Sequence, residues 1–452
     1  MWRKMAVSIG ILVVLCVGGA FVYLKAKTGT PPHIDPSKRE LWQSEGYNYI
    51  LEMDGENVIV YNFTKDSLLP FAYGQIEKDG VIYVEKFHGN PLLNTTLWKR
   101  APLGHFQNGI LTEETGAVKR YKKIDELPKV KINAFTKDPI QNFETLWQIF
   151  DERFSLFELA KVDWKQVYEE YRPKVTEQTS EEELRLLFKE MIGKLNDGHT
   201  MILSGTTTTV SREESEREKL YNENEETMRK NILGYLNGPL QKRLNDQLQY
   251  GQTKDGIGYI DMNGFGEFDM KKIDAALADV AKELAGSRGV VIDLRFNGGG
   301  SDAFAVAFAN RFTDQKKLAF SKQARSGGYE QFLAPTPIYI KPQGESIPAD
   351  KIVVMTSEVT ASAAEIATMS LKEIDRVTVI GETTRGIHSD VLMNILPNEW
   401  IVMLSAEQYK AADGKVYERV GLKPDEEVLI RNEDIQAGKD PVLARAIELL
   451  KS

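Results

Sequence analysis

The apolar positions along the chain change their spacing several times, and each change marks a different kind of segment. Residues 6–24 are almost wholly apolar, a run of about nineteen residues, which is long enough to cross a bilayer as a helix. Basic residues stand on both sides of this run, so the charge signal for its orientation is mixed. We expect an uncleaved signal anchor over residues 1–27, with the rest of the chain outside the cytoplasm. A signal peptide cleaved near residues 18–20 is the alternative.

Residues 40–133 have the composition of a small β-rich domain, and a proline-containing linker at residues 28–39 precedes it. Strand-like runs cover residues 47–53, 58–63 and 81–86, and Asp-Gly pairs between them mark turns. Such a domain can position a substrate or dock a partner, and the sequence does not distinguish the two.

Residues 138–204 carry apolar side chains at helical spacing, with an aromatic stripe that is typical of a core. The run Ser180–Glu183 is a capping box that opens the last helix, and Gly198 fits the left-handed residue after its end. His199 is therefore expected on a turn beyond a helix end, where its ring can be aimed at a site. A structural histidine is the alternative. Residues 205–255 predict a charged insert of helix and loop.

Residues 256–452 alternate between short apolar runs and helical patterns, which predicts a layered α/β core. The expected strands lie at residues 257–262, 290–294, 352–355, 377–380, 391–396 and 400–404. The expected helices lie at residues 270–284, 305–311, 366–371 and 443–450.

Composition narrows the classes of function. The chain has 452 residues, so two or three domains are expected, and its net charge of −9 argues against nucleic-acid binding. Its one cysteine, Cys16, lies in the apolar N-terminal run, so no disulfide can form within the chain. His88 and His105 are isolated from other ligand-type residues, and the sequence carries no nucleotide-binding motif. We expect no metal ion and no cofactor.

Candidate chemistry begins at Ser362, where an apolar strand gives way to a helix. A serine at that turn lies near the positive end of the helix dipole, where negative charge is stabilised. The residue is either a nucleophile or a helix cap. A second strand ends in the glycine run Gly298, Gly299 and Gly300, whose amides can turn toward one point. This run is an oxyanion hole, a phosphate cradle or a plain tight turn.

Five short motifs occur in order: Leu195–Thr200, Ile292–Gly300, Thr360–Glu365, Gly381–Gly386 and Glu418–Asp425. Together they resemble the tail-specific, or C-terminal processing, serine peptidase family. The resemblance is to its tricorn-core and interphotoreceptor-retinoid-binding-protein-like branch, and it runs from about residue 138 to the C-terminus. It implies a crotonase-like ββα spiral core, Ser362 as the nucleophile, and an oxyanion hole made by the amide of Ala363 with one from Gly298–Gly300. Many relatives carry a PDZ domain after the histidine motif, and the polar stretch here predicts none.

The resemblance leaves two choices of base. The bacterial processing branch uses a lysine directly after Gly-x-x-Thr-x-Gly, but here Ile387 and His388 follow Gly386. Lys372 lies at the far end of the expected serine helix. A Ser-Lys dyad is therefore not expected.

The tricorn-like branch maps its base onto His199 and its glutamate onto Glu418, and His388 is the alternative base. Gly198 stands where tricorn has a second catalytic serine, so another group must complete the relay. Ala363 stands where tricorn has an aspartate, so a preference for basic substrates does not carry over.

The sequence thus predicts a membrane-anchored, extracytoplasmic serine endopeptidase that cleaves polypeptides through an acyl-enzyme on Ser362, with His199 as base and Glu418 as its partner. Secretion after signal cleavage is the alternative location. Two other functions remain open on the same fold. One is a non-catalytic protein that binds hydrophobic ligands, and the other is a hydrolase of a non-peptide ester or amide.

Overall fold

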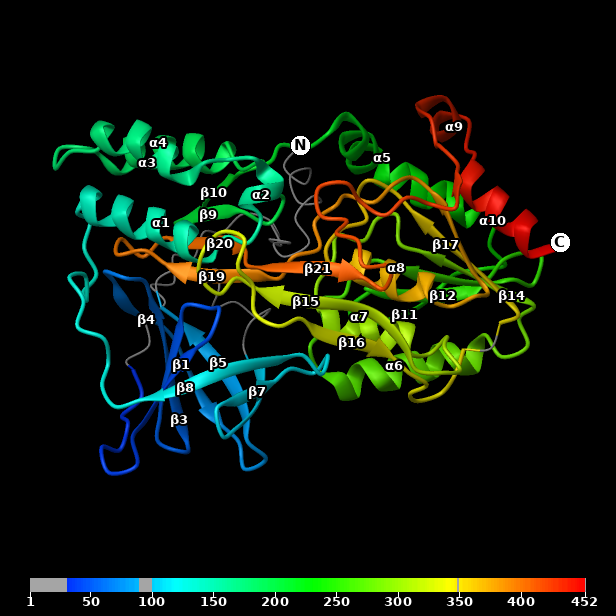
Figure 1. The fold of residues 1–452 in the computed structure, drawn as a ribbon. Coiled ribbons are helices and arrows are strands. Elements are labelled where there is room, and N and C mark those ends of the chain that lie inside the picture. The colour runs from blue at the N-terminus through cyan, green and yellow to red at the C-terminus, as the bar shows by residue number, and fades with distance from the viewer. Residues whose placement is uncertain (1–30, 89–99, 348, 452) are drawn as a thin grey trace, which may run out of the picture.

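The computed structural model describes residues 31–88, 100–347 and 349–451 (Figure 1). The expected signal anchor lies outside these residues. Within the described ranges no helix is long and apolar enough to cross a membrane.

The expected β-rich domain is a closed barrel, in which the first and last of eight strands pair antiparallel. Apolar side chains fill it, including Leu51, Val58, Phe71 and Val84. The alternation of apolar and polar residues predicted only some of the barrel strands, because several of the others are short or polar on their outer face. The strands are β1 Glu40–Ser44, β2 Tyr49–Met53, β3 Asn57–Phe63, β4 Leu68–Ile76, β5 Val81–Phe87, β6 Ala101–Gln107, β7 Ile110–Thr112 and β8 Val118–Ile124.

A four-stranded sheet lies between the barrel and a layer of helices, in the order β10-β9-β20-β19. On one face, Val402 and Leu404 pack with the helical aromatic stripe, as expected for a core. On the other face, Ile401 and Met403 pack with the barrel. The helices are α1 Pro139–Arg153, α2 Phe157–Ala160, α3 Trp164–Tyr171 and α4 Glu181–Gly193, and the strands are β9 Met201–Ser204, β10 Thr207–Val210, β19 Val391–Ile395 and β20 Ile401–Ser405.

The C-terminal part is built on a seven-stranded sheet, in the order β11-β12-β13-β14-β17-β18-β22. From β13 to β22 neighbouring strands run parallel, within the layered α/β core that the strand–helix alternation predicted. The charged insert also supplies β11 and β12 at one edge, which was not foreseen because these strands are rich in polar residues. The strands are β11 Gln241–Arg243, β12 Leu248–Gln252, β13 Gly258–Met262, β14 Gly289–Asp293, β17 Lys351–Thr356, β18 Val377–Gly381 and β22 Glu426–Glu427.

Helices cover both faces of this sheet (Figure 1). One face packs against α6 Met270–Glu283, α7 Asp302–Ala309 and α8 Ala363–Lys372, through residues such as Ile352 and Val354. The intervening residues Val353 and Met355 face the other way, toward α5 Glu216–Leu233, α9 Asn432–Gln436 and α10 Pro441–Lys451. The continuous apolar run of β17 therefore reflects a strand that is buried on both faces.

A three-stranded sheet, β16-β15-β21, joins this core to the barrel. Lys322 of β15 is buried there, with Nζ 3.0 Å from a carboxylate oxygen of Glu113 in the barrel and 3.2 Å from one of Glu407. A buried ion pair of this kind fixes the orientation of the two parts more than it adds stability. The strands are β15 Lys317–Ala324, β16 Thr336–Ile340 and β21 Glu407–Ala411.

Candidate active site

Three of the sequence motifs meet because they follow neighbouring parallel strands. The glycine run follows β14, the serine motif follows β17, and the Gly381–Gly386 motif follows β18. These strands pair in register, with Asp293 beside Met355 and Thr356 beside Gly381. Since the carboxyl ends of parallel strands lie at one edge of a sheet, the three loops converge there, where ligands of open α/β sheets bind.

Ser362 has a backbone conformation that is rare for a side-chain-bearing residue. Its φ is 55° and its ψ is −127°, and it stands at the N-cap of α8. Such a conformation costs about 1–3 kcal/mol and persists only when the surroundings enforce it. Here the surroundings do so, because the Ser362 amide donates to the Ile387 carbonyl at 3.1 Å and to Glu365 Oε2 at 3.3 Å.

Glu365 connects the serine turn to the loop after β18. It is fully buried, and its Oε1 accepts from Thr384 Oγ1 at 2.5 Å and from the Gly386 amide at 2.8 Å. Its Oε2 accepts from the Ile387 amide at 2.8 Å. From its place on the first helical turn alone, Glu365 is expected only to stabilise the helix dipole. The capping-box spacing from Ser362 to Glu365 was the signal for this connection, but the loop partners are distant in sequence.

The glycine run packs directly against Ser362. A Cβ built on Gly299, whose φ is 108°, would lie 2.6 Å from the Ser362 Cβ, so only glycine fits there. The Gly299 amide already donates to Asn297 Oδ1 at 2.9 Å, which removes it from the predicted oxyanion donors. No partner among the described residues accepts from the amides of Gly298, Gly300 or Ala363.

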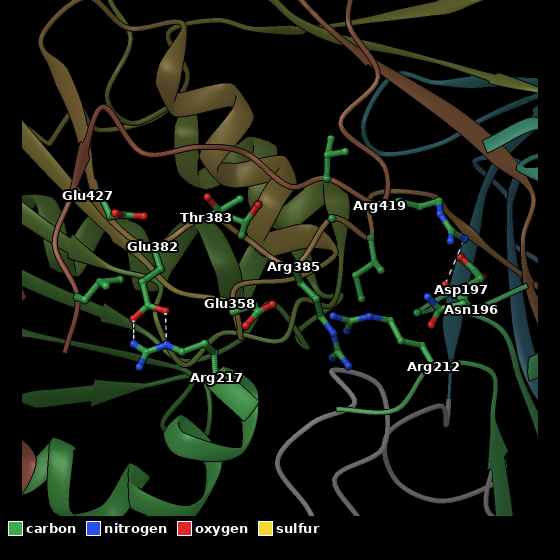
Figure 2. A pocket seen from close by; sticks show the side chains of 16 residues that line it. Asn196, Asp197, Arg212, Arg217, Glu358, Glu382, Thr383, Arg385, Arg419 and Glu427 are labelled. Atoms are coloured by element: carbon green, nitrogen blue, oxygen red, sulfur yellow. Dashed lines mark hydrogen bonds and ion pairs between the residues drawn. The ribbon is translucent and has the colours of Figure 1, made fainter. Parts of the chain in front are cut away.

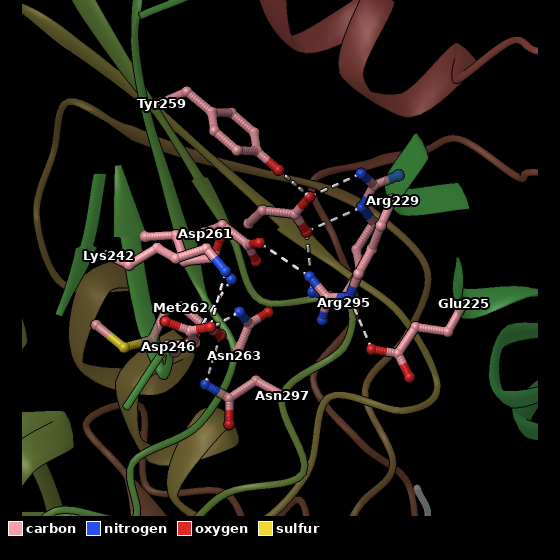
Figure 3. Close-up of polar contacts among 12 residues, drawn as sticks. Glu225, Arg229, Lys242, Asp246, Tyr259, Asp261, Met262, Asn263, Arg295 and Asn297 are labelled. Atoms are coloured by element: carbon pink, nitrogen blue, oxygen red, sulfur yellow. Dashed lines mark hydrogen bonds and ion pairs between the residues drawn. The ribbon is translucent and has the colours of Figure 1, made fainter. Parts of the chain in front are cut away.

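A buried ion-pair network supports the strand end that carries the glycine run (Figure 3). Arg295 is fully buried, and its Nη2 lies 2.7 Å from Asp293 Oδ2 and 2.9 Å from Asp440 Oδ2. Tyr259 donates to Asp293 Oδ2 at 2.8 Å, and Asn297 Nδ2 donates to the Met262 carbonyl at 2.8 Å. Asp293 and Arg295 thus hold the strand end that precedes the glycine run.

His199 reaches this edge from the other sheet. It lies between α4 and β9, it is 4% exposed, and its Nδ1 is buried without a hydrogen-bond partner among the described residues. A Cβ on the preceding Gly198 would lie 2.3 Å from Ile387 Cγ2. This close approach places the histidine loop against the residue whose carbonyl accepts the Ser362 amide.

Glu418 and His388 complete the set of predicted residues. Glu418 Oε2 accepts from the amides of His388 at 2.9 Å and Ser389 at 3.0 Å, whereas its Oε1 is buried and has no hydrogen-bond partner in the described part of the chain. The His388 ring lies between two carboxylates, with Nε2 3.4 Å from Glu365 Oε1 and Nδ1 4.0 Å from Glu418 Oε2. Among the residues that the structure describes, both His388 ring nitrogens are buried without a hydrogen-bond partner, whereas for His199 this holds only for Nδ1.

Burial shifts the titration of these groups. It lowers the pKa of His199, against the raising effect of the nearby Asp197 and Glu365 carboxylates. Burial likewise lowers the pKa of His388, with Glu365 opposing. The pKa of Glu418 is held well above its usual range by burial and then by the negative charges of Asp197 and Glu365. Both histidines are therefore neutral at pH 7, as a base must be.

Lys372 is not placed to activate Ser362. It is the last residue of α8, and its Nζ donates to Asp425 Oδ1 at 2.8 Å. Within the described ranges no group of three or more histidine, cysteine, aspartate or glutamate side chains is arranged to hold a metal ion.

A cavity of about 410 Å³ opens beside the site (Figure 2). Its walls come from the same loops that carry the predicted residues. Its lining residues are Asn196, Asp197, Gly198, Arg212, Arg217, Glu358, Glu382, Thr383, Thr384, Arg385, Gly386, Ile387, Arg419, Val420, Glu427 and Leu429.

A serine on a strained turn at a helix N-terminus, beside a glycine turn and neutral histidines, is an arrangement that serine hydrolases use. Comparison with known proteins points to one family of serine hydrolases. Residues 256–428 match the model of peptidase family S41, and residues 135–193 match that of the tricorn protease C1 domain. The C-terminal core is thus similar to peptidase family S41, in agreement with the five sequence motifs.

Curated relatives support this placement. The chain is 31% identical over 176 residues to the carboxy-terminal processing protease CtpA of Bacillus subtilis, which covers 39% of this chain and 36% of the relative. It is 26% identical over 207 residues to the carboxyl-terminal-processing protease of Synechocystis, and this match covers 45% of this chain and 46% of the relative. The chain thus spans less than half the length of these relatives.

Solved structures show similar folds. A protein from Parabacteroides merdae assigned as a peptidase superposes with a TM-score of 0.60 at 28% identity, over 70% of this chain and 98% of that one. Mature CPAF superposes with a TM-score of 0.53 at 12% identity, over 70% and 96%, and this likeness concerns the fold alone.

Proposed function

We propose that this protein is a serine endopeptidase that cleaves polypeptides through an acyl-enzyme on Ser362. The observation that carries the proposal is the conformation of Ser362, with φ at 55° and its amide held by Ile387 and Glu365. A plain helix cap does not require this conformation, because cap residues have extended backbone. The strained backbone of Ser362 presents its hydroxyl at the N-terminus of α8.

His199 acts as the general base in this proposal. A neutral imidazole takes the serine proton during attack and returns it to the leaving amine. His199 is preferred over His388 because both nitrogens of His388 are enclosed. The base in most relatives of this family is a lysine, so a histidine base is the finer part of the proposal.

Glu418 orients and stabilises the protonated base. Glu418 and His199 both lie within the electrostatic reach of Asp197 and Glu365. Each has one buried atom, Oε1 of Glu418 and Nδ1 of His199, without a hydrogen-bond partner within the described ranges. In this proposal, a positive charge that forms on His199 would lower the pKa of Glu418 and favour its ionised form. Because Gly198 stands where tricorn has a serine, Glu418 acts on His199 through its electrostatic field or through the hydroxyl of another residue.

The oxyanion of the tetrahedral intermediate is held by the amide of Ala363, at the first turn of α8, with the amide of Gly298 or Gly300. These amides have no partner among the described residues, whereas the Gly299 amide is engaged by Asn297. Donors that are fixed before the reaction stabilise developing charge without reorganisation.

The location of the protein is also a proposal, which rests on the apolar run at residues 6–24. The run anchors the chain in the cell membrane, with the crotonase-like core and the barrel outside the cytoplasm. Membrane fractionation of the full chain beside a chain that begins at residue 31 tests this. Recovery of the full chain in the soluble fraction at its uncleaved mass would contradict it.

Labelling with a fluorophosphonate, which reacts with activated serines, tests the chemistry. Ser362→Ala is expected to abolish labelling of the purified full chain, and His199→Ala and Glu418→Ala to slow it. Slow labelling in His388→Ala, together with normal labelling in His199→Ala, would move the base to His388. An unlabelled folded wild type that binds a hydrophobic ligand would favour the non-catalytic alternative, and cleavage of esters without peptides would favour the other hydrolase.

A further inference from the structure

Glu418 and the next residue, Arg419, contact different parts of the site. Glu418 is buried, whereas Arg419 is exposed. Arg419 Nη1 donates to the carbonyl of Leu195 at 2.7 Å and to that of Asn196 at 3.2 Å. Figure 2 shows the Arg419 side chain extending to the chain at Asn196. These two carbonyls belong to the loop that carries His199, and residues 195–199 are called the histidine loop below.

The backbone of Arg419 holds a second loop. Its amide donates to the carbonyl of Gly386 at 2.7 Å. A Cβ on Gly386 would lie 2.7 Å from the amide nitrogen of Gly421, so the two stretches of chain are in close contact. The residue after Gly386 is Ile387, whose carbonyl accepts the Ser362 amide. Arg419 therefore joins the serine side of the site, through its backbone, to the histidine loop, through its side chain.

Arg419 has a left-handed backbone conformation that is rare for a residue with a side chain. Its φ is 67°. Gly421, two residues later, has a φ of 71°, and glycine adopts this region without strain. A turn alone would therefore form more easily with glycine at position 419. Strain of this kind persists only where the surroundings enforce it, and a side chain in this region points to a use for that side chain.

A simpler role for the Arg419 side chain is helix capping. Helix α4 ends at Gly193, so the two carbonyls that Arg419 contacts lie just beyond its C-terminus, where a cation is favourable. Lys194 lies at the same helix end, and its Nζ is 3.0 Å from a carboxylate oxygen of Glu170 in an exposed pair. A role confined to capping therefore predicts similar effects from the loss of either cation.

The histidine loop and the loop that carries Glu418 belong to different sheets. The first leads into β9 of the four-stranded sheet, and the second leads into β22 of the seven-stranded sheet. The placement of His199 relative to Ser362 therefore depends on contacts between loops, and a displacement of about 1 Å can slow a reaction about a hundredfold. We propose that Arg419 is a positioning residue, which holds the histidine loop where His199 can take the proton of Ser362. This inference rests on the proposed function, in which His199 is the base.

The fluorophosphonate labelling rate of full-chain variants tests the inference. Arg419→Met keeps the aliphatic stem but removes the donors, and it is expected to slow labelling by about tenfold or more while still unfolding cooperatively in urea. Arg419→Lys keeps the charge and a shorter donor, so it is expected to label at an intermediate rate, and it serves alone if Arg419→Met does not fold. Lys194→Met removes the other cation at this helix end and should label like wild type.

A double-mutant cycle separates positioning of the base from general support of the site. In the His199→Ala background, the Arg419 substitution is expected to slow labelling no further, because no imidazole is left to position. A residue that supports only the turn at Ser362 would slow labelling by the same factor in both backgrounds.

Three results would overturn the inference and leave the proposed function standing. They are labelling of the Arg419 variant at the wild-type rate, equal slowing by the Arg419 and Lys194 substitutions, and equal slowing by the Arg419 substitution with and without His199. Labelling that is unchanged in His199→Ala, or absent from folded wild type, would instead overturn the proposed function on which the inference rests.

Discussion

The carboxylate of Glu365 holds the amide of Ser362 at 3.3 Å while it binds the loop that precedes His388. One buried side chain thus sets the conformation of the proposed nucleophile and the position of the loop that lines the cavity beside the site. The Glu365 carboxylate also lies within electrostatic reach of His199 and Glu418. Its replacement is therefore expected to affect both stability and reactivity.

Glu365→Gln should destabilise the fold by about 3 kcal/mol, because an amide nitrogen replaces an oxygen that accepts hydrogen bonds at a fully buried position. Urea unfolding measures the change. Fluorophosphonate labelling should also slow at temperatures where the variant is folded, since the Ser362 turn loses a partner. Glu433→Gln, on the exposed face of α9, is the control and should match wild type. Equal stability of Glu365→Gln and wild type would contradict this account.

Gly299→Ala should slow labelling at Ser362 by at least about a hundredfold, because a Cβ would stand 2.6 Å from the Ser362 Cβ and displace the hydroxyl. Gly286→Ala provides a matched control. Gly286 also has a positive φ, of 87°, but its Cβ would meet nothing within 4 Å. The control should lose about 1–2 kcal/mol of stability from backbone strain and should keep its labelling rate. Similar labelling rates in the two variants would show that Gly299 does not position the serine.

The labelling rate should fall as the pH falls through the pKa of His199. Burial lowers this pKa below its ordinary value of 6.5, so the neutral base persists into mildly acidic solution and the midpoint should lie below 6.5. Measurement of the labelling rate from pH 4 to 8, with the stability checked at each pH, tests this. A midpoint above 6.5 would mean that the carboxylates around His199 outweigh its burial.

Arg385→Gln should move that midpoint upward. The positive charge of Arg385 lowers the pKa of His199, so its removal stabilises the imidazolium and shifts inactivation toward neutral pH. Because the small labelling reagent contains no carboxylate, the shift reports the charge of Arg385 acting on His199. A midpoint that is unchanged or lower would contradict the electrostatic coupling.

The buried groups also predict opposite effects of pH on folding. The two histidines have lowered pKa values in the folded state, so their contribution is lost as the pH falls below about 6.5, where the unfolded chain binds protons first. Glu418 has a raised pKa, so its contribution is lost as the pH rises above about 4.5. Glu418→Gln should therefore raise the stability at pH 7 relative to that at pH 4. Urea unfolding of this variant and wild type at both pH values measures the difference.

Asp440→Asn should cost about 3–5 kcal/mol, because it removes one of the two carboxylates that neutralise the buried Arg295. Asp255→Asn, which breaks the exposed pair with Lys451, should cost less than about 1 kcal/mol. Thermal unfolding of both variants gives the comparison. A loss of similar size in the two would mean that the buried network does not support the strand end at the glycine run.

The sequence by itself determined the features that depend on short stretches of chain. The apolar runs predicted strands of the core sheet, the small residues after β17 indicated the turn at Ser362, and consecutive glycines indicated a turn after β14, because these signals arise from neighbouring residues. The five motifs, taken together, indicated the family. The barrel was foreseen only as a β-rich region, since closure depends on the pairing of β1 with β8 across about eighty residues.

Only the tertiary structure decided which side chains meet. The convergence of the three loops follows from the order of strands in the sheet, and the approach of Gly198 to Ile387 follows from the packing of two sheets. The tertiary structure also decided the hydrogen bond of the Gly299 amide, the four hydrogen bonds to Glu365 and the carboxylate shared by Arg212 and Arg385. Some of these interactions join residues that lie far apart in the sequence, and the geometry of the others is not specified by any local pattern. Hydrogen bonds and charges act over a few ångströms, and in this chain those distances are set by packing between elements rather than by spacing along the sequence.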